Sequence, residues 1–226
     1  MDFAHSGRTQ ALQEKLARFM RDEVVPAEQA YAAALTGNAD WRAWRQPPIM
    51  ETLKAKAREA GLWNLFLAEA EYGPGLGNVE YAPLAETMGH SFIAPEVFNC
   101  SAPDTGNMEV LARHGSEEQK QRWLQPLLAG EIRSAFCMTE PGVASSDATG
   151  MRATARIEGG DVVLNGRKWW STGIGHPHCR FAIFMGLSDP DAPPHQRHSM
   201  VICPLDAPGV RIERMLPVFH DYDEPS

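Results

Sequence analysis

Apolar residues in the first half of the chain recur at helical spacing. One face of the first expected helix carries four of them, Leu12, Leu16, Phe19 and Met20. We expect this helix to end near Pro26, because proline has no amide proton to donate. A second helix is expected to begin after Pro47 and Pro48, and Gly61 is placed to end it in a left-handed cap.

Two further helices are expected before residue 130. One follows Asn78 and closes at Gly89, with Tyr81, Leu84, Ala85 and Met88 spaced along one face, and Pro83 strains or delays its first turn. The other starts at Ser116, whose side chain can form a capping box with Gln119. It is expected to run towards Gly130, with a kink or an early end at Pro126.

After Gly130 the spacing of apolar residues changes to two, which is typical of strands. We expect strands in five stretches, 151–157, 161–164, 180–187, 199–205 and a shorter one at 210–214. Gly159-Gly160 and Asn165-Gly166 are both typical of two-residue hairpin turns. The pattern predicts an antiparallel meander, with Trp170 and Thr172 on the strand after the second turn.

Helices followed by strands predict an α+β fold with two domains. We expect an all-α N-terminal domain over residues 1–130 and an antiparallel β-domain over residues 131–226. The length of 226 residues suffices for a sizeable core in either part.

Charge and composition exclude several partners. The net charge is -8 and the sequence pI is near 5.5, with no run dense in lysine or arginine, so we expect no broad attraction to nucleic acid or to anionic membranes. No stretch is apolar enough to read as a membrane span, and the N-terminus carries no basic, apolar signal. We therefore expect a cytoplasmic protein.

The cysteines give no sign of a disulfide framework. Cys100, Cys137, Cys179 and Cys203 are few and show no C-x-x-C spacing, so reduced, structural thiols are expected. A zinc site is an alternative, because His176, His178, Cys179, His195 and His198 fall within a short span. The surrounding sequence is rich in turn residues, which favours solvated loop histidines instead of a metal site.

The glycines between Gly73 and Gly77 invite a comparison with phosphate-binding loops. However, no strand–loop–helix pattern surrounds them, and their spacing does not match the dinucleotide fingerprint. We interpret the segment as a connector into the Asn78 helix.

Polar and aromatic residues between Ala135 and Thr172 could bind a flat, polar-rimmed ligand. The hydroxyls of Thr139 and Thr172 can donate or accept, and the indole of Trp170 can cover an aromatic face. Ser145 and Ser146 could contact a pyrophosphate or a thioester, or could simply cap a turn. Taken singly, each of these residues also suits an ordinary strand, core or turn position.

Together these segments resemble the acyl-CoA dehydrogenases, a family of flavoenzymes. The resemblance rests on four ordered motifs: Tyr72-Gly-Pro-Gly-Leu-Gly-Asn-Val-Glu-Tyr, His114-Gly-Ser-Glu-Glu-Gln-Lys-Gln-Arg-Trp-Leu, Phe136-Cys-Met-Thr-Glu-Pro-Gly and Gly166-Arg-Lys-Trp-Trp-Ser-Thr. It covers nearly all of the chain from Pro26. The loop Val143-Ala-Ser-Ser-Asp is most similar to the branch that includes family members 10 and 11.

The resemblance implies a site for FAD. Phe136, Met138 and Thr139 would contact the flavin ring, Trp170 would pack against it, and Thr172 would bond near its N5 atom. One of Ser145 and Ser146 would contact the flavin pyrophosphate or the acyl thioester. Ser146 is favoured because it directly precedes Asp147, as in the shorter loop of the family.

The resemblance also implies an activity in fatty acid metabolism, the α,β-dehydrogenation of an acyl-CoA. A carboxylate removes the α-proton while a hydride passes to flavin N5. The family's catalytic glutamate lies in a C-terminal helical bundle, expected beyond Ser226. Glu140 instead corresponds to a structural turn, so no catalytic base is assigned in this chain. The β-domain is expected to lack closing strands, leaving an open sheet edge.

The implied partners are an acyl-CoA, an electron-transfer flavoprotein or similar acceptor, and further copies of the chain. Two alternatives stay open. The chain could be a non-catalytic remnant or interaction scaffold that binds through its open edge, or part of a related flavin-dependent oxidase or monooxygenase.

Overall fold

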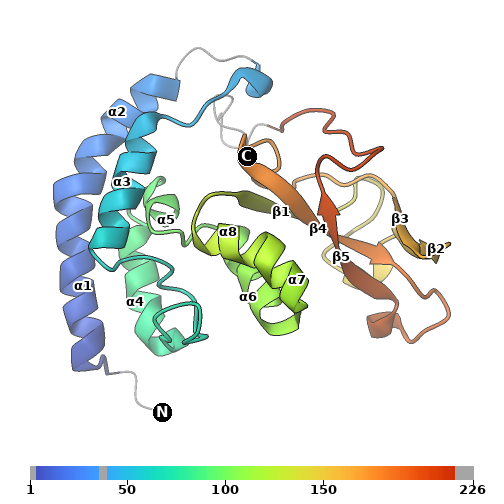
Figure 1. Cartoon of the computed structure of the whole chain (residues 1–226), viewed down its shortest axis with the longest axis horizontal. Coiled ribbons are helices and arrows are strands. Elements are labelled where there is room, and N and C mark those ends of the chain that lie inside the picture. The colour runs from blue at the N-terminus through green and yellow to red at the C-terminus, as the bar shows by residue number, and fades with distance from the viewer. Residues whose placement is uncertain (1–3, 36–39, 217–226) are drawn as a thin grey trace. The chain divides into compact units, whose positions relative to one another are not determined.

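The computed structural model describes residues 4–35 and 40–216 and divides into two compact units. The first comprises the described residues up to 35 and residues 43–131, and all its regular elements are helical. The second comprises residues 40–42 and 132–216 and contains the sheet. Figure 1 shows the helices in blue to green and the strands in olive to red. The predicted α+β class is confirmed.

The helical unit is built from eight α-helices and two π-helical turns among the described residues. Its elements are α1 (Gly7–Phe19), η1 (Met20–Val24), α2 (Val25–Leu35), α3 (Pro48–Glu59), α4 (Asn78–Met88), α5 (Ala94–Val97), α6 (Asp104–His114), α7 (Glu117–Gln119), η3 (Lys120–Leu124) and α8 (Gln125–Leu128). Helix α1 packs on α4, α2 packs on α3, and α6 packs on η3 and α8. Helices α5 and α6 were not predicted.

Pro26, which was expected to end a helix, and Pro126, which was expected to kink a helix or end it early, both lie in a helix that continues. The predicted end near Pro26 is wrong, because the helix runs on through α2 to Leu35. Immediately before Pro26, the amide of Val25 bonds to the carbonyl of Met20, and before Pro126 the amide of Gln125 bonds to Lys120. Each is a π-type bond, which widens the turn where a proline would otherwise clash with the preceding carbonyl.

The predicted caps are confirmed at α3 and α7. Gly61 adopts φ +62°, and the amides of Gly61 and Leu62 bond to the carbonyls of Arg58 and Ala57, the pattern of a Schellman cap. At α7, Ser116 Oγ accepts from the Gln119 amide at 3.2 Å, and Gln119 Oε1 accepts from the Ser116 amide at 2.9 Å.

The predicted helix after Asn78 is confirmed as α4, which contains Pro83 and is followed by Gly89. Gly77 is its N-cap, and the Gly77 amide bonds to the carboxylate of Glu80 at 3.0 Å. Residues 73–77 form the connection into this helix. A Cβ at Gly73 would lie 2.7 Å from both Leu67 Cβ and Leu67 O, so close backbone packing explains the glycine.

Buried asparagines hold the carboxyl end of α8. Asn99 Nδ2 donates to Asn64 Oδ1 at 2.6 Å and to the Leu127 carbonyl at 2.9 Å, while Asn64 Nδ2 reaches the Leu128 carbonyl at 3.1 Å. Both asparagines have positive φ. These bonds satisfy carbonyls that a helix end leaves without an intrahelical partner.

The sheet unit contains five strands: β1 (Arg133–Cys137), β2 (Thr154–Glu158), β3 (Asp161–Asn165), β4 (Cys179–Leu187) and β5 (His198–Pro204). The β2–β3 hairpin and the β4–β5 pair are antiparallel. Strand β1 runs parallel to β4, and β2 also meets β4 in parallel at Thr154 and Leu187. The sheet is therefore mixed, and the prediction of a wholly antiparallel meander is corrected.

Three local predictions in this unit need correction. The hairpin at Gly159-Gly160 is present, but no strand follows Asn165-Gly166 directly. Asn165 lacks the positive φ that a type I′ turn requires. Trp170 and Thr172 therefore lie in a loop between β3 and β4 and not on a strand. Residues 210–214 are irregular rather than a strand.

The core of the sheet unit is made largely of small and aromatic side chains. One buried cluster consists of Ala135, Cys137, Ala153, Cys179, Ala182 and Phe184, and Met151, Phe181 and Ile183 are buried as well. Cys100, Cys137, Cys179 and Cys203 are free thiols in the structure. Strand β4 is paired on both sides, which explains its nearly continuous apolar sequence.

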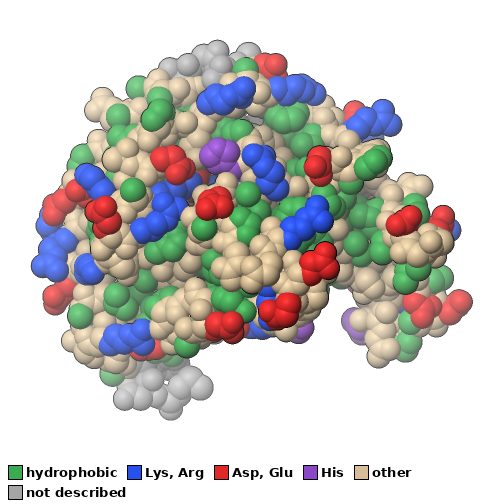
Figure 2. Space-filling view, in the orientation of Figure 1, with side chains coloured by type: hydrophobic (Ala, Val, Ile, Leu, Met, Phe, Trp, Pro, Cys, Tyr) green, Lys and Arg blue, Asp and Glu red, His purple; other side chains and the backbone are tan. Residues whose placement is uncertain are grey.

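Acidic and basic side chains are interspersed over the helical unit on the face that Figure 2 shows. Lysine and arginine do not gather there into one field, in keeping with the lack of a dense basic run in the sequence. Within residues 4–35 and 40–216, none of the helices combines the length and apolar character needed to cross a bilayer.

Gly130 gives a test of the packing at the end of the helical unit. It has φ +69°, and a Cβ there would lie 2.7 Å from Trp63 Cζ2 and 3.0 Å from Arg58 Nη2. Left-handed strain and overpacking predict that Gly130→Ala lowers the free energy of unfolding by about 2–4 kcal/mol in denaturant titrations.

The matched control is Gly106→Ala, in α6, where a Cβ would meet nothing within 4 Å. This change is expected to be neutral or to stabilise by up to about 1 kcal/mol. Equal effects of the two substitutions would contradict the packing argument.

Candidate functional site

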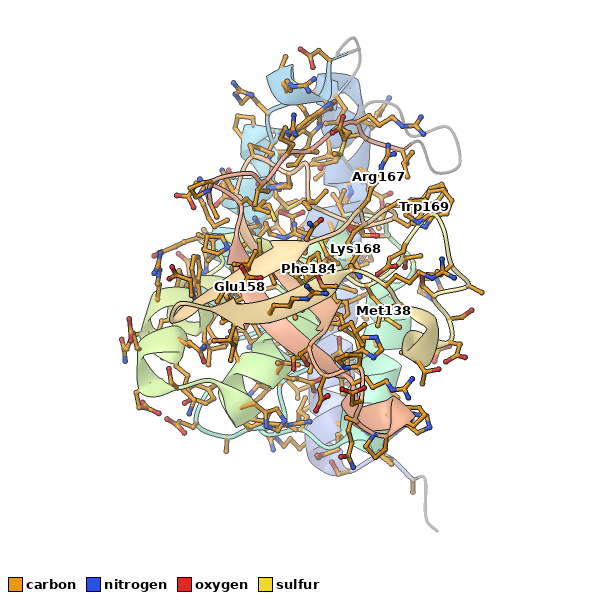
Figure 3. The ribbon with its side chains drawn as sticks, turned by 90° about the vertical axis from the view of Figure 1, so that its right-hand side faces the viewer. Met138, Glu158, Arg167, Lys168, Trp169 and Phe184 are labelled. Atoms are coloured by element: carbon orange, nitrogen blue, oxygen red, sulfur yellow. The ribbon has the colours of Figure 1, made fainter. Side chains whose placement is uncertain are left out.

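The two motif segments lie side by side in the sheet unit. The amide of Trp169 donates to the Thr139 carbonyl at 3.0 Å, and Lys168 Nζ donates to the Met138 carbonyl at 2.8 Å. Figure 3 shows Lys168 with Met138 and Phe184 near it. The residues after β1 and the loop after β3 thus form one continuous surface.

A buried ion pair joins these segments. Lys168 Nζ lies 2.9 Å from Glu140 Oε1, and the two side chains are 6% and 7% exposed. The amide of Ala153 donates to Oε1 and the amide of Arg152 donates to Oε2, each at 2.9 Å. Lys168 Nζ also lies 4.9 Å from the centre of the Phe184 ring, within range of a cation–π contact.

The environment of Glu140 favours its ionised form. Burial raises the pKa of the Glu140 carboxyl, but the hydrogen bonds from Lys168, Arg152 and Ala153 outweigh burial, so the pKa lies below its ordinary value. Both carboxylate oxygens already accept hydrogen bonds. Glu140 is therefore poorly suited to removing a proton from a substrate.

The two adjacent serines differ in their surroundings. The buried Ser145 Oγ accepts from the Glu140 amide at 2.8 Å and donates to the Val143 carbonyl at 3.3 Å, so it closes the turn that follows Glu140. Ser146 is exposed. Next to it, Asp147 Oδ1 accepts from the amide and hydroxyl of Thr149 at 3.0 and 2.6 Å.

Strand β1 has an open edge next to this surface. Among the described residues it pairs only with β4. Phe136 is paired with Ile183 of β4, and no other described strand pairs with β1. Phe136, Met138 and Thr139 are each half-buried, which leaves part of each accessible to a ligand.

Trp170 stands out by its backbone as well as its exposure. It has φ +53°, which is unusual for a bulky side chain, and it is 51% exposed. Its ring centre lies 5.9 Å from that of Trp169. Thr172, in the same loop, is also exposed. The loop thus places an indole and a hydroxyl at the surface near β1.

Sequence reasoning named Lys168 within a motif but assigned it no role. It also missed the contact between Cys137 and Ser171. Burial raises the pKa of the Cys137 thiol, and the bond with Ser171 opposes this increase only in part. In the sequence, the position of Lys168 next to Trp169 could have drawn attention to it. No feature of the neighbouring sequence indicates that Lys168 pairs with Glu140, which is 28 residues away.

An open pocket of about 480 Å³ is lined in part by the turn from Glu140 to Val143. Its lining includes Glu140, Asn165 and the three arginines Arg152, Arg156 and Arg167. All three arginines are exposed. The pocket adds a basic surface next to the site.

The histidines of the zinc alternative do not converge on one point, as the ligands of a metal ion would. The His178 amide donates to His176 Nδ1 at 3.1 Å, and His198 Nε2 lies 3.2 Å from the Met151 carbonyl. Within the described ranges, no group of three or more histidine, cysteine or acidic side chains is placed to hold a metal ion.

Glu140 predicts a dependence of stability on pH. Because its folded-state pKa is lowered, the carboxylate stabilises the fold above its unfolded-state pKa of about 4.3, and this contribution is lost as the pH falls through the folded-state pKa. Glu140→Gln is expected to cost about 3 kcal/mol at neutral pH, since it leaves Lys168 buried without its counter-charge.

Unfolding curves of the two proteins between neutral pH and strongly acidic pH check this expectation. The difference should shrink at the acidic end. Glu158→Gln, on the exposed tip of the hairpin, is the matched control and should show little effect. A Glu140→Gln difference that does not change with pH would contradict the assignment.

Comparisons with known proteins identify the family of the chain. The profile of the acyl-CoA dehydrogenase N-terminal domain matches residues 6–131, and that of the acyl-CoA dehydrogenase middle domain matches residues 135–219. Acyl-CoA dehydrogenase family member 10 of Mus musculus is 52% identical over 222 residues, which are 95% of this chain and 20% of that protein.

The probable acyl-CoA dehydrogenase FadE2 of Mycobacterium tuberculosis is also 52% identical over 222 residues, covering 97% of this chain and 53% of that protein. A solved structure of an acyl-CoA dehydrogenase-like protein from Mycobacterium abscessus superposes with a TM-score of 0.92 and 59% identity, over 98% of this chain and 56% of the other. The chain thus spans about half or less of these relatives.

The predicted resemblance, including its relation to the branch of family member 10, is confirmed. The chain belongs to the acyl-CoA dehydrogenase family, of which it contains the N-terminal and middle domains.

Proposed function

We propose that the chain forms the FAD-binding part of an enzyme that dehydrogenates an acyl-CoA between its α and β carbons. The observation that carries this proposal is that residues 136–140 and 168–172 are joined by hydrogen bonds from the Trp169 amide and from Lys168. Backbone groups, two hydroxyls and an indole of these segments therefore lie close together. A flavin ring needs both features, polar contacts around its rim and an apolar cover on its face.

The residues present fit such a ring. Phe136 lies on β1, which has an open edge, and Met138 and Thr139 follow that strand directly. Trp170 is exposed although it is large and apolar, and its left-handed backbone is the kind of strain found at ligand sites. We assign Phe136, Met138 and Thr139 to the rim of the ring, Trp170 to its face and Thr172 to a bond near N5.

The serine loop suits the more polar parts of the ligands. Ser145 has its hydroxyl engaged with Glu140 and Val143, whereas Ser146 is exposed, so we assign the contact with pyrophosphate or acyl thioester to Ser146. Ser145 then acts indirectly, by fixing the turn that carries Ser146.

The flavin would supply the redox step, since no side chain can accept a hydride equivalent. The chain's own contribution is binding and orientation. Glu140 is held by Lys168 and two amides, which supports leaving the role of the base to a carboxylate outside this chain. The proposal further includes an electron-transfer flavoprotein or similar acceptor as partner, assembly into homo-oligomers, a role in fatty acid metabolism and a cytoplasmic location.

The protein, purified in its native length, is expected to show flavin absorbance that an acyl-CoA bleaches in the absence of oxygen. A stable protein without flavin would favour the interaction scaffold. Rapid oxygen consumption by the reduced flavin would favour an oxidase or monooxygenase. Bleaching that persists until an electron acceptor is added would support the dehydrogenase.

Trp170→Ala is expected to weaken flavin binding about tenfold, because it removes a large apolar cover from the ring. Titration of the apoprotein with FAD, followed by flavin fluorescence, measures the change. Ile157→Ala is the control, since Ile157 is 83% exposed on the hairpin of the same unit. Unchanged affinity in Trp170→Ala would argue against this placement of the flavin.

A further inference from the structure

We propose that the buried Lys168–Glu140 pair is the positioning element of the flavin site, which sets how residues 136–140 and 168–172 lie relative to each other. This inference rests on the proposed function. Neither residue is assigned a contact with flavin or substrate. Both would act through the backbone that they hold.

Three separate stretches of chain converge on this pair. Glu140 follows β1, the amides of Arg152 and Ala153 come from the segment entering β2, and Lys168 comes from the loop after β3. The carboxylate accepts three hydrogen bonds, all at 2.9 Å. Moving any one of the three stretches would stretch at least one of these bonds.

The ammonium group is equally constrained. Lys168 Nζ donates to Met138 O at 2.8 Å and to Glu140 Oε1 at 2.9 Å, and it faces the ring of Phe184 on β4. Figure 3 shows Lys168, Met138 and Phe184 in this arrangement. The contact with Met138 matters most, because it fixes the backbone at the point where the open edge of β1 ends.

Stability alone does not explain why a buried ion pair occurs at this position. A buried ion pair loses hydration on both sides, and apolar residues of similar size often replace such pairs without loss of stability. Unlike an apolar contact, an ion pair also forms hydrogen bonds with a preferred direction, which fix the positions of the bonded groups. Here the pair makes three directional bonds to backbone atoms, to the Met138 carbonyl and to the amides of Arg152 and Ala153, all at 2.8–2.9 Å.

The backbone held by the pair lies next to the residues assigned to the flavin. Met138 is bonded directly, Thr139 bonds to the Trp169 amide, and Trp170 follows in the chain. A displacement of about 1 Å between reacting groups can reduce a rate up to about a hundredfold. Loss of the pair should therefore reduce turnover more than it weakens substrate binding.

Two substitutions test this in the native-length protein purified with FAD. Lys168→Met removes the charge and keeps the length of the side chain. Glu140→Asp keeps the charge and shortens the reach, so it decides the question even if Lys168→Met does not fold. Both should shift the visible flavin spectrum and slow flavin reduction at saturating acyl-CoA about tenfold, with KM changed less than about threefold.

Arg167→Met is the matched control. It removes a neighbouring positive charge whose side chain is exposed and makes none of the contacts of Lys168. It should leave the flavin spectrum and the rate of flavin reduction unchanged.

The outcomes separate the inference from the function on which it rests. If the variants lose thermal stability but keep the flavin spectrum and reduction rate, the pair is only structural and the inference is overturned while the function stands. If the unsubstituted protein binds no flavin, the proposed function is overturned and the inference with it.

Discussion

The buried carboxylate of Glu140 joins three stretches of the sheet unit. A carboxylate with 7% exposure is stable only if charge and hydrogen bonds replace the water that it has lost. Glu140 meets this requirement with an ammonium group and two backbone amides. The chain must therefore bring three distant stretches to one point, and that point lies beside the residues that we assign to the flavin. The same ion pair and hydrogen bonds therefore stabilise the buried carboxylate and lie beside the proposed site.

Local features of the sequence predicted local structure well. The glycine cap of α3, the capping box of α7, the Gly159-Gly160 hairpin and strands β4 and β5 each depend on residues close together in the chain, so their patterns are visible in it. The family motifs indicated the family in the same way. The sequence did not predict which strands pair when they are far apart in the chain. Nothing in the periodicity of β1 says that it runs parallel to β4, because both antiparallel and parallel strands alternate with a period of two.

In the site, too, residue types could be predicted from the sequence, but contacts between distant residues could not. The residue types from Phe136 to Thr172 suggested a flat, polar-rimmed ligand, but the ion pair found among them joins Glu140 and Lys168, which are far apart in the sequence. The left-handed backbone of Trp170 was also invisible, because that conformation is imposed on a bulky residue by its surroundings and is not favoured by the residue itself. The different environments of Ser145 and Ser146 follow from the fold of the turn, which two identical side chains cannot reveal.

Pro26 and Pro126 of the helical unit each follow a π-helical turn. At Pro26 and Pro126 the helix accommodates the missing amide by a wider turn just before the proline. Such a turn is equivalent to an α-helix that has gained one residue. The apolar stripe before the turn and the stripe after it therefore need not share one register, and each can face its own neighbours. In evolutionary terms, both sites are places where a single-residue insertion can be absorbed inside a helix without disturbing either of its ends.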